Sequence, residues 1–263
     1  MIAIITGAAS GIGKAVALRL AEDSVSRQSR PAQLLLVDIA SAGLEAVAVS
    51  LRAGGAQVQT VVADLGDEHA APHIVDRAVE SFGGLDALIS NAGVIQRASL
   101  LDLTVQDYER SFAINVRATW LLGKAAHAHL ARTRGALVAT ASVAAHEPAP
   151  PLGAYSASKA ALVMLVRQMA CEWGPDGIRC NTVSPGSTHT GMTDARYSNP
   201  ELRASAAERN PLRMVGSPEH QAAAIAFLAG PEAAYITGAD LVVDGGIRTM
   251  LMTASALGDP WRR

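Results

Sequence analysis

The sequence lacks several features that mark particular protein classes. It has two cysteines, Cys171 and Cys180, in 263 residues, which gives no disulfide framework and is typical of a reducing cytosol. The net charge is −2 without a basic block, so nucleic acid is not an expected partner. Glycines and a lysine between Gly7 and Lys14 interrupt the apolar N-terminus, which argues against a signal peptide or a membrane span. We expect a cytoplasmic protein that does not insert into a membrane.

Aromatic residues are also scarce, at 4% of the chain against 49% hydrophobic residues, so alanine and aliphatic side chains must form the core. Continuous apolar runs alternate with longer helical patterns, as in parallel sheets that are buried on both faces. Expected strands are 2–6, 33–38, 57–63, 86–90, 136–141, 179–184 and 241–243. Expected helices are 11–23, 41–53, 67–82, 104–132 and 154–174. This alternation predicts a single α/β domain over 1–263, with a doubly wound parallel sheet of about seven strands between two helical layers.

Three segments fall outside this alternation. Residues 23–32 are polar and predict a looped-out insertion before the second strand. Residues 186–215 show no clear period, and a long loop in a compact domain is more often functional than idle, so we interpret them as a substrate loop. The tail 247–263, which contains Trp261, follows the last expected strand. It either folds over a neighbouring subunit's site or frays.

A glycine-rich segment, Thr6-Gly7-Ala8-Ala9-Ser10-Gly11-Ile12-Gly13, follows the first expected strand directly. Glycine permits a tight turn and close approach of the backbone to a pyrophosphate. The N-terminus of the next helix offers free N–H groups to that anion. We interpret the segment as a dinucleotide-binding loop, with an ordinary strand-to-helix turn as the alternative. Its contact residues would be Gly7, Ser10, Gly11, Ile12 and Gly13.

Tyr155 and Lys159 stand at the head of an alanine-rich helical pattern. Four-residue spacing places both side chains on one helix face. An ammonium group beside a phenol lowers the phenol's pKa from about 10, which allows proton exchange with a substrate hydroxyl near neutral pH. The alternative is a surface pair, because this spacing also arises by chance.

The two motifs together resemble the short-chain dehydrogenase/reductase family, through Gly-x-x-x-Gly-x-Gly and Tyr155-x-x-x-Lys159. Asn91-Ala92-Gly93 and the segment 181–186 followed by Thr190 are similar to further motifs of that family. The resemblance covers roughly Met1 to Gly246 and implies a Rossmann fold and an oxidoreductase. It also implies a catalytic tetrad, formed by Asn115, Ser142, Tyr155 and Lys159.

Asp38 ends the second expected strand, where a carboxylate accepts hydrogen bonds from ribose hydroxyls and repels a 2′-phosphate. Ala9 and Ser10 are small and neutral where a 2′-phosphate would call for a cation, so we expect NAD rather than NADP. A solvated strand-end residue is the alternative for Asp38, and capping of the next helix is the alternative for Asp64. The resemblance implies further cofactor contacts from Asp64, Leu65, Asn91, Ala92, Gly93, Tyr155, Lys159, Pro185, Gly186, Thr188 and Thr190.

The reaction that the resemblance implies uses Tyr155 as general acid–base. Ser142 would donate a hydrogen bond to the substrate oxygen. Lys159 would lower the pKa of Tyr155 and hold the nicotinamide ribose. Asn115 would loosen its helix so that the main chain holds a water that links Lys159 to solvent.

The substrate is expected to be a small secondary alcohol or ketone: a cyclic alcohol, a dihydrodiol or a polyol. Two stretches, 142–146 and 185–190, resemble family members that form dihydroxybenzoate, but 91–97 lacks an arginine at the place where a carboxylate would be held. We expect no metal, because no third ligand accompanies His69 and His73. The expected substrate contacts are Gln96, Ser142, His146, Leu152, Tyr155, Ser187 and Met192.

Two other functions remain as alternatives. A non-catalytic NAD-binding regulator could use the same fold, although the complete tetrad argues against it. A sugar-nucleotide epimerase would need a larger substrate domain than this length provides. The helical patterns 104–132 and 154–174 are apolar around much of their circumference, which predicts a homotetramer, or a dimer as the fallback.

Overall fold

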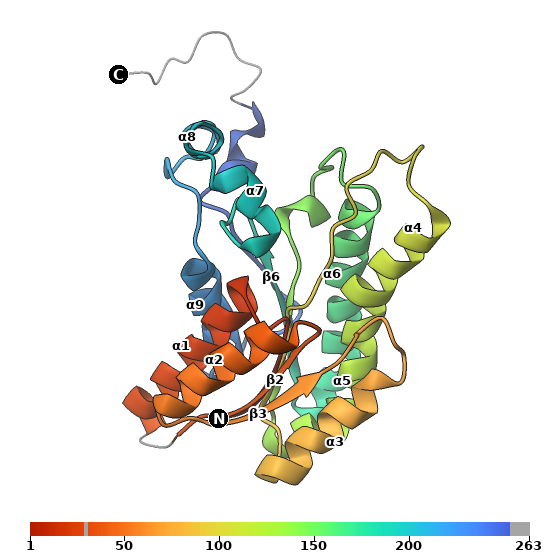
Figure 1. Cartoon of the computed structure of the whole chain (residues 1–263). Coiled ribbons are helices and arrows are strands. Elements are labelled where there is room, and N and C mark those ends of the chain that lie inside the picture. The colour runs from red at the N-terminus through yellow and green to blue at the C-terminus, as the bar shows by residue number, and fades with distance from the viewer. Residues whose placement is uncertain (29–30, 253–263) are drawn as a thin grey trace.

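The computed structural model describes residues 1–28 and 31–252 (Figure 1). One parallel sheet of seven strands, ordered β3-β2-β1-β4-β5-β6-β7, forms the centre. This doubly wound sheet confirms the predicted α/β fold class. Its strands are β1 (Ile2–Thr6), β2 (Gln33–Asp38), β3 (Gln57–Val62), β4 (Ala87–Ser90), β5 (Ala136–Thr140), β6 (Arg179–Pro185) and β7 (Asp240–Val243).

Helices cover both faces of the sheet (Figure 1). On one face lie α1 (Gly11–Gln28), α2 (Ser41–Ala53) and α9 (Pro218–Ala229). On the other lie α3 (Ala70–Phe82), α5 (Ala118–Thr133) and α6 (Tyr155–Trp173). The remaining helices are α4 (Val105–Phe112), α7 (Asp194–Tyr197) and α8 (Pro200–Glu208). Short 3₁₀ turns occur at Val143–Ala145, Gly174–Asp176, Gly191–Thr193, Pro231–Ala233 and Ile247–Met252.

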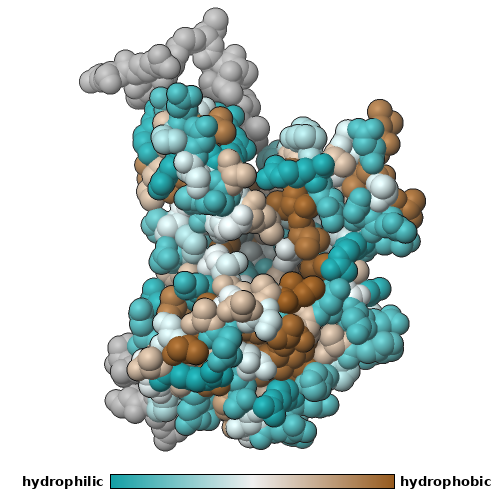
Figure 2. All heavy atoms as spheres, in the orientation of Figure 1, coloured by the Kyte–Doolittle hydropathy of each residue, from teal (hydrophilic) through white to brown (hydrophobic). Residues whose placement is uncertain are grey.

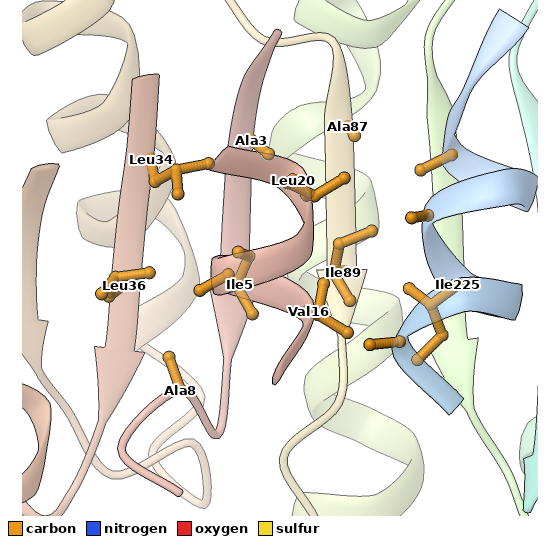
Figure 3. Packing of buried hydrophobic residues seen from close by; sticks show 14 of the residues in the cluster. Ala3, Ile5, Ala8, Val16, Leu20, Leu34, Leu36, Ala87, Ile89 and Ile225 are labelled. Atoms are coloured by element: carbon orange, nitrogen blue, oxygen red, sulfur yellow. The ribbon is translucent and has the colours of Figure 1, made fainter. Parts of the chain in front are cut away.

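The apolar strands supply both layers of the core because their side chains alternate between the two faces. In β1, Ala3 and Ile5 pack on the side of α1, α2 and α9 (Figure 3). Ile4 packs on the other side, with α3, α5 and α6. All three side chains are fully buried. Burial on both faces explains why these strands are continuously apolar, and each large aliphatic side chain contributes about 1.5–3 kcal/mol.

Two predictions about connections are wrong. Residues 23–28 are not a looped-out insertion, because α1 continues to Gln28 and buries Ser24. The segment 186–215 is not without regular structure, because it contains α7 and α8. Asn199 caps α8 by accepting hydrogen bonds from two backbone N–H groups, and Pro200 occupies the first turn. The tail residues 253–263, including Trp261, lie outside the described residues.

The predicted helix 104–132 consists of three consecutive elements. α4 ends at Phe112, a π-helical turn spans Ala113–Arg117, and α5 follows without a break. Asn115 lies in the widened turn, as the family resemblance implies. None of the helices in 1–28 and 31–252 combines the length and hydrophobicity that a membrane crossing requires.

Candidate functional site

A cavity of about 580 Å³ lies at the carboxyl ends of the strands. The strand order reverses beside β1, where doubly wound sheets place their ligands. Figure 2 shows a hollow on this face, below the segment that carries α7 and α8, with hydrophobic atoms along one wall. Most predicted site residues line the cavity: Gly7, Ser10, Gly11, Ile12, Asp38, Asp64, Leu65, Asn91, Ala92, Gly93, Ser142, Leu152, Tyr155, Lys159, Pro185, Gly186, Ser187, Thr188, Thr190 and Met192.

The glycine-rich turn brings the start of α1 to this cavity. Gly7 and Gly11 have φ values of 67° and 53°, which only glycine adopts without strain. A Cβ atom at Gly13 would lie 2.1 Å from the Gly7 carbonyl oxygen, so glycine is required for the helix to start this close to the turn. Lys14 N donates to Ser10 O, and the N–H groups before it have no partner within the helix. The turn therefore fits a pyrophosphate.

Asp38 is fixed at the end of β2 by two backbone donors. Ala9 N donates to its Oδ2 at 3.0 Å, and Ala40 N donates to its Oδ1 at 3.0 Å. The carboxylate thus lies beside the glycine-rich turn and on the cavity wall. A carboxylate in this place has acceptor capacity left for a ribose hydroxyl.

Asp64 lines the cavity beyond β3 and forms an ion pair with Arg110 of α4. The Gly66 N–H donates to Asp64 Oδ1 at 2.8 Å and, followed by the Arg110 guanidinium, lowers the pKa of this carboxyl. Since α3 begins only at Ala70, Asp64 does not cap it, and the capping alternative is wrong. Sequence reasoning missed Arg110, because the pair joins residues 46 positions apart and no local pattern marks it.

Asn91 ties together three strand ends under the cavity. Its Nδ2 donates to Thr6 O at 3.1 Å, and its Oδ1 accepts from Thr140 Oγ1 at 3.0 Å. Its backbone N–H and that of Ala92 donate to Thr6 Oγ1. These bonds join the ends of β1, β4 and β5 and so fix the floor of the cavity.

Ser142, Tyr155 and Lys159 meet at one end of the cavity. Burial raises the pKa of Tyr155, and a hydrogen bond with Ser142 opposes that rise. Lys159 Nζ donates to Thr140 O at 2.7 Å and lies 5.8 Å from the centre of the Tyr155 ring. Burial lowers the pKa of Lys159 to about 8. The expectation of an acidified phenol is therefore wrong for the protein's own groups, because the effect of burial on the pKa exceeds that of the hydrogen bond with Ser142.

Asn115 lies behind the cavity rather than on its wall. Its Oδ1 accepts from Val94 N at 2.8 Å, and its Nδ2 donates to Val94 O and to Ser158 Oγ. The side chain thus holds the segment after β4 against α6. The π-helical turn around it leaves main-chain groups without their usual helical partners.

Two predicted substrate contacts, Gln96 and His146, are not on the cavity wall. His146 lies 2.6 Å from Asp240, a carboxylate that also accepts hydrogen bonds from Thr182 and Ser184. His146 therefore ties the segment after Ser142 to β7. The place of His146 in the sequence, just after Ser142, did not reveal this contact, because Asp240 lies 94 positions further along the chain. Among the described residues, no group of His, Cys, Asp and Glu side chains is arranged to hold a metal ion.

The segment after β6 closes one side of the cavity through hydrogen bonds of its threonines. Thr193 Oγ1 donates to Thr188 O at 2.7 Å, and Thr190 N donates to Thr193 Oγ1. The buried Gln221 of α9 donates to Thr188 Oγ1 at 3.2 Å and to Val243 O at 3.0 Å. Sequence reasoning missed Gln221, which fixes this segment to α9 and β7.

Residues 7–248 match a family model described as enoyl-(acyl carrier protein) reductase. The 2-(R)-hydroxypropyl-CoM dehydrogenase of Xanthobacter autotrophicus is 37% identical over 93% of this chain and 97% of its own length. Cis-4-hydroxycyclohexanecarboxylate dehydrogenase of Sinomonas cyclohexanicum is 38% identical over 93% of this chain and 95% of its own length. A short chain dehydrogenase from Burkholderia cenocepacia, solved in complex with NADP, is 37% identical, with a TM-score of 0.83 over 94% of this chain and 97% of that one. These matches extend over nearly the whole chain.

Proposed function

The chain belongs to the short-chain dehydrogenase/reductase family and is an oxidoreductase that acts on CH–OH donors, and from this premise we propose that Tyr155 is its general acid–base in hydride exchange between a secondary alcohol and NAD. The observation that carries the proposal is the meeting of Ser142, Tyr155 and Lys159 in the same cavity as the glycine-rich turn. The experiment that tests it is a spectrophotometric assay of NADH formation with a panel of secondary alcohols.

In this mechanism the chain's own residues position the substrate oxygen and move one proton. Ser142 donates a hydrogen bond to that oxygen and holds it near the Tyr155 hydroxyl. For oxidation, Tyr155 accepts the alcohol proton; for reduction, it donates a proton to the ketone oxygen. A bound nicotinamide supplies the hydride acceptor or donor. Lys159, which would hold the cofactor ribose, lies beside the phenol, where its positive charge favours the phenolate.

Because the pKa of Tyr155 is raised, the rates of ketone reduction and alcohol oxidation should depend on pH in opposite ways. At neutral pH the phenol keeps its proton, so the protein's own groups are ready to donate to a ketone. Alcohol oxidation needs the phenolate, and its rate should therefore rise with pH above 7. A cavity wall that keeps the phenol protonated thus fits ketone reduction at neutral pH and alcohol oxidation at higher pH.

NAD is the proposed cofactor, with Asp38 as the residue that selects it. Its carboxylate would accept from the ribose and repel a 2′-phosphate. Arg110, a cation on the same cavity wall, is engaged by Asp64 through two hydrogen-bonding nitrogens. The related Burkholderia cenocepacia structure contains NADP, so the choice has to be tested on this chain.

Replacing Asp38 by alanine together with Ile39→Arg is expected to reverse the cofactor preference. The lost ribose contact should lower kcat/KM with NAD by about 10- to 100-fold, and removal of the repulsion with addition of a cation should raise kcat/KM with NADP. Ile39 is 63% exposed, so an arginine there is tolerated. Steady-state kinetics with both cofactors measures the ratio. Asp38→Asn, which keeps an acceptor for Ala9 N, is the control for loop geometry, and an unchanged NAD/NADP ratio in the double variant contradicts this assignment.

A homotetramer is the proposed assembly, because exposed apolar side chains form two separate groups. Trp120 of α5 and Met164 of α6 are 43% and 61% exposed. Phe227 of α9 and Leu241 of β7, on the other side of the sheet, are 42% and 37% exposed. Two self-complementary surfaces on one subunit generate a closed tetramer, and one generates a dimer.

Light scattering is expected to give about four times the subunit mass of 27.2 kDa. The double variant Trp120→Glu and Met164→Glu should give dimers, because it places charge in one of the two surfaces only. Arg132→Glu, an exposed change near the other end of the same helix, controls for charge alone. A wild-type mass of one subunit at micromolar concentration excludes both the tetramer and the dimer.

A further inference from the structure

The charged side chains of the cavity wall are concentrated in one of its two halves. Within the described chain its lining contains four of them, Asp38, Asp64, Arg110 and Lys159. The first two follow β2 and β3, and Arg110 is paired with Asp64, so these three belong to the half over β1–β3. Lys159 is therefore the one cation that the described residues place in the half over β4–β6. It is 3% exposed and donates to Thr140 O.

Apolar side chains make up most of the half over β4–β6. Val94 and Ile95 follow β4, Val143 follows β5, and Leu152 precedes α6. Met192 comes from the segment after β6 and is 48% exposed. These residues come from three connections, after β4, between β5 and α6, and after β6, yet line one cavity. Hydrophobic atoms line one wall of the hollow in Figure 2. This half can bury an apolar body, and its cation, Lys159, is almost fully buried and already donates to Thr140 O.

Few hydroxyl groups in this half are free to bind a substrate. Thr188 Oγ1 donates to Gly186 O, and Thr193 Oγ1 donates to Thr188 O, so both already serve the loop itself. Ser142 and Tyr155 are assigned to the reacting oxygen. Ser187 Oγ and the Tyr197 hydroxyl have no hydrogen-bond partner among the described residues, and both residues line the cavity. Two hydroxyls besides the reacting pair are thus available.

We propose that the substrate is a neutral secondary alcohol with an apolar body and at most two further hydroxyls, which Ser187 and Tyr197 receive, and that carboxylate-bearing alcohols and polyols with more hydroxyls are rejected. This inference rests on the proposed function. A carboxylate in this half would lose its hydration without gaining a partner. Each additional hydroxyl of a polyol would likewise lose hydrogen bonds to water that the apolar wall does not replace. An anionic dihydrodiol, as in dihydroxybenzoate formation, is excluded for the same reason.

Four compounds on one six-membered ring separate these possibilities. The probes are the methyl ester of cis-4-hydroxycyclohexanecarboxylic acid, the free acid, cyclohexane-1,2-diol and inositol, assayed with NAD and the full-length chain. The ester and the acid have nearly the same shape and differ in charge. We expect kcat/KM for the ester to exceed that for the acid by at least about 100-fold. The diol should be oxidised and inositol should not.

A charge introduced into the wall tests the cause of this selectivity. Met192→Lys is expected to raise kcat/KM for the acid and to lower it for the ester, because it supplies the missing cation at a site exposed enough to accept it. Met192→Leu is the matched neutral control and should leave the ester-to-acid ratio within about threefold of wild type. Ser187→Ala should lower turnover of the diol more than that of the ester.

The outcomes distinguish this inference from the function on which it rests. Equal or better turnover of the acid, or turnover of inositol at the rate of the diol, contradicts the neutral-substrate inference and leaves the oxidoreductase intact. Binding of NADH without turnover of any probe contradicts both. Calorimetric binding of cyclohexanecarboxamide and cyclohexanecarboxylate to the NADH complex then reports on the cavity alone. Tighter binding of the carboxylate overturns the inference even when no probe reacts.

Discussion

Tyr155→Phe is expected to lower kcat by roughly 10²–10⁴-fold and to leave cofactor binding nearly unchanged. The substitution removes one oxygen and keeps the ring that packs at the head of α6. Without the hydroxyl, no group at this position can take the alcohol proton or protonate the ketone. Initial rates of NADH formation and fluorescence titration with NADH measure the two quantities separately.

The pH dependence of the oxidation rate is a second test of the Tyr155→Phe variant. Because burial raises the pKa of Tyr155, wild-type oxidation should accelerate as pH rises, and the residual rate of Tyr155→Phe should lose that dependence. Tyr108→Phe makes the same chemical change on an exposed part of α4 and is the matched control. A Tyr155→Phe enzyme with wild-type turnover refutes the assignment of the proton to this residue.

Lys159→Met is expected to damage catalysis and cofactor binding together. Loss of a charged donor to the cofactor ribose should raise the Kd for NADH by about 10- to 100-fold. Loss of the cation beside the phenol should lower kcat as well. Methionine keeps the length of the side chain and its packing in the buried site.

The same variant is expected to unfold no more easily than wild type at pH 7. Burial lowers the pKa of Lys159 from 10.5 to about 8, which corresponds to a folding cost of about 3 kcal/mol. The folded pKa lies below the unfolded one, so at pH 7 both states hold the proton and the full cost is present. That cost disappears as pH rises from 8 toward 10.5, because the unfolded chain then binds more protons. Methionine carries no charge, so the variant lacks this folding cost at every pH. It also loses the stabilising hydrogen bond from Lys159 to Thr140 O.

Thermal unfolding without NADH measures the stability of Lys159→Met, and the rise in Tm on adding NADH reports its cofactor binding. Arg132→Met, which removes an exposed cation of α5, is the control and should change neither stability nor binding. A large fall in the Tm of Lys159→Met in the absence of cofactor indicates a structural role. Retained stability with lost activity indicates that this buried cation serves function at the expense of folding free energy.

Most of the helices and strands could be predicted from local patterns in the sequence. β1 and β2 begin and end where continuous apolar runs predict them, because a strand buried on both faces needs apolar residues at every position. The polar stretch 23–28 was wrongly predicted to be a loop, because polar residues alone do not end a helix and the stretch contains no glycine or proline. Helix caps at Asn199 and Pro200 were present in the sequence as a signal for α8.

The site was predictable where function dictates spacing, and not where distant side chains meet. Ser142, Tyr155 and Lys159 lie together as their motif implies. His146 pairs with Asp240, and Arg110 pairs with Asp64, through contacts that only the folded chain creates. The pKa of Tyr155 was predicted in the wrong direction for a related reason. The four-residue spacing predicts that Lys159 lies near Tyr155 but says nothing about how deeply the phenol is buried. Burial is the largest influence on the pKa of Tyr155.

The most direct test follows the hydride itself. The enzyme is incubated with NAD and a neutral secondary alcohol that carries deuterium on its carbinol carbon, and the reduced dinucleotide is examined by mass spectrometry. The account predicts one deuterium in the NADH formed by wild type and none formed by Tyr155→Phe on the same timescale. Saturating cofactor binding with no deuterium in the dinucleotide, for any alcohol in the panel, would contradict it and would favour a protein that binds NAD without catalysis.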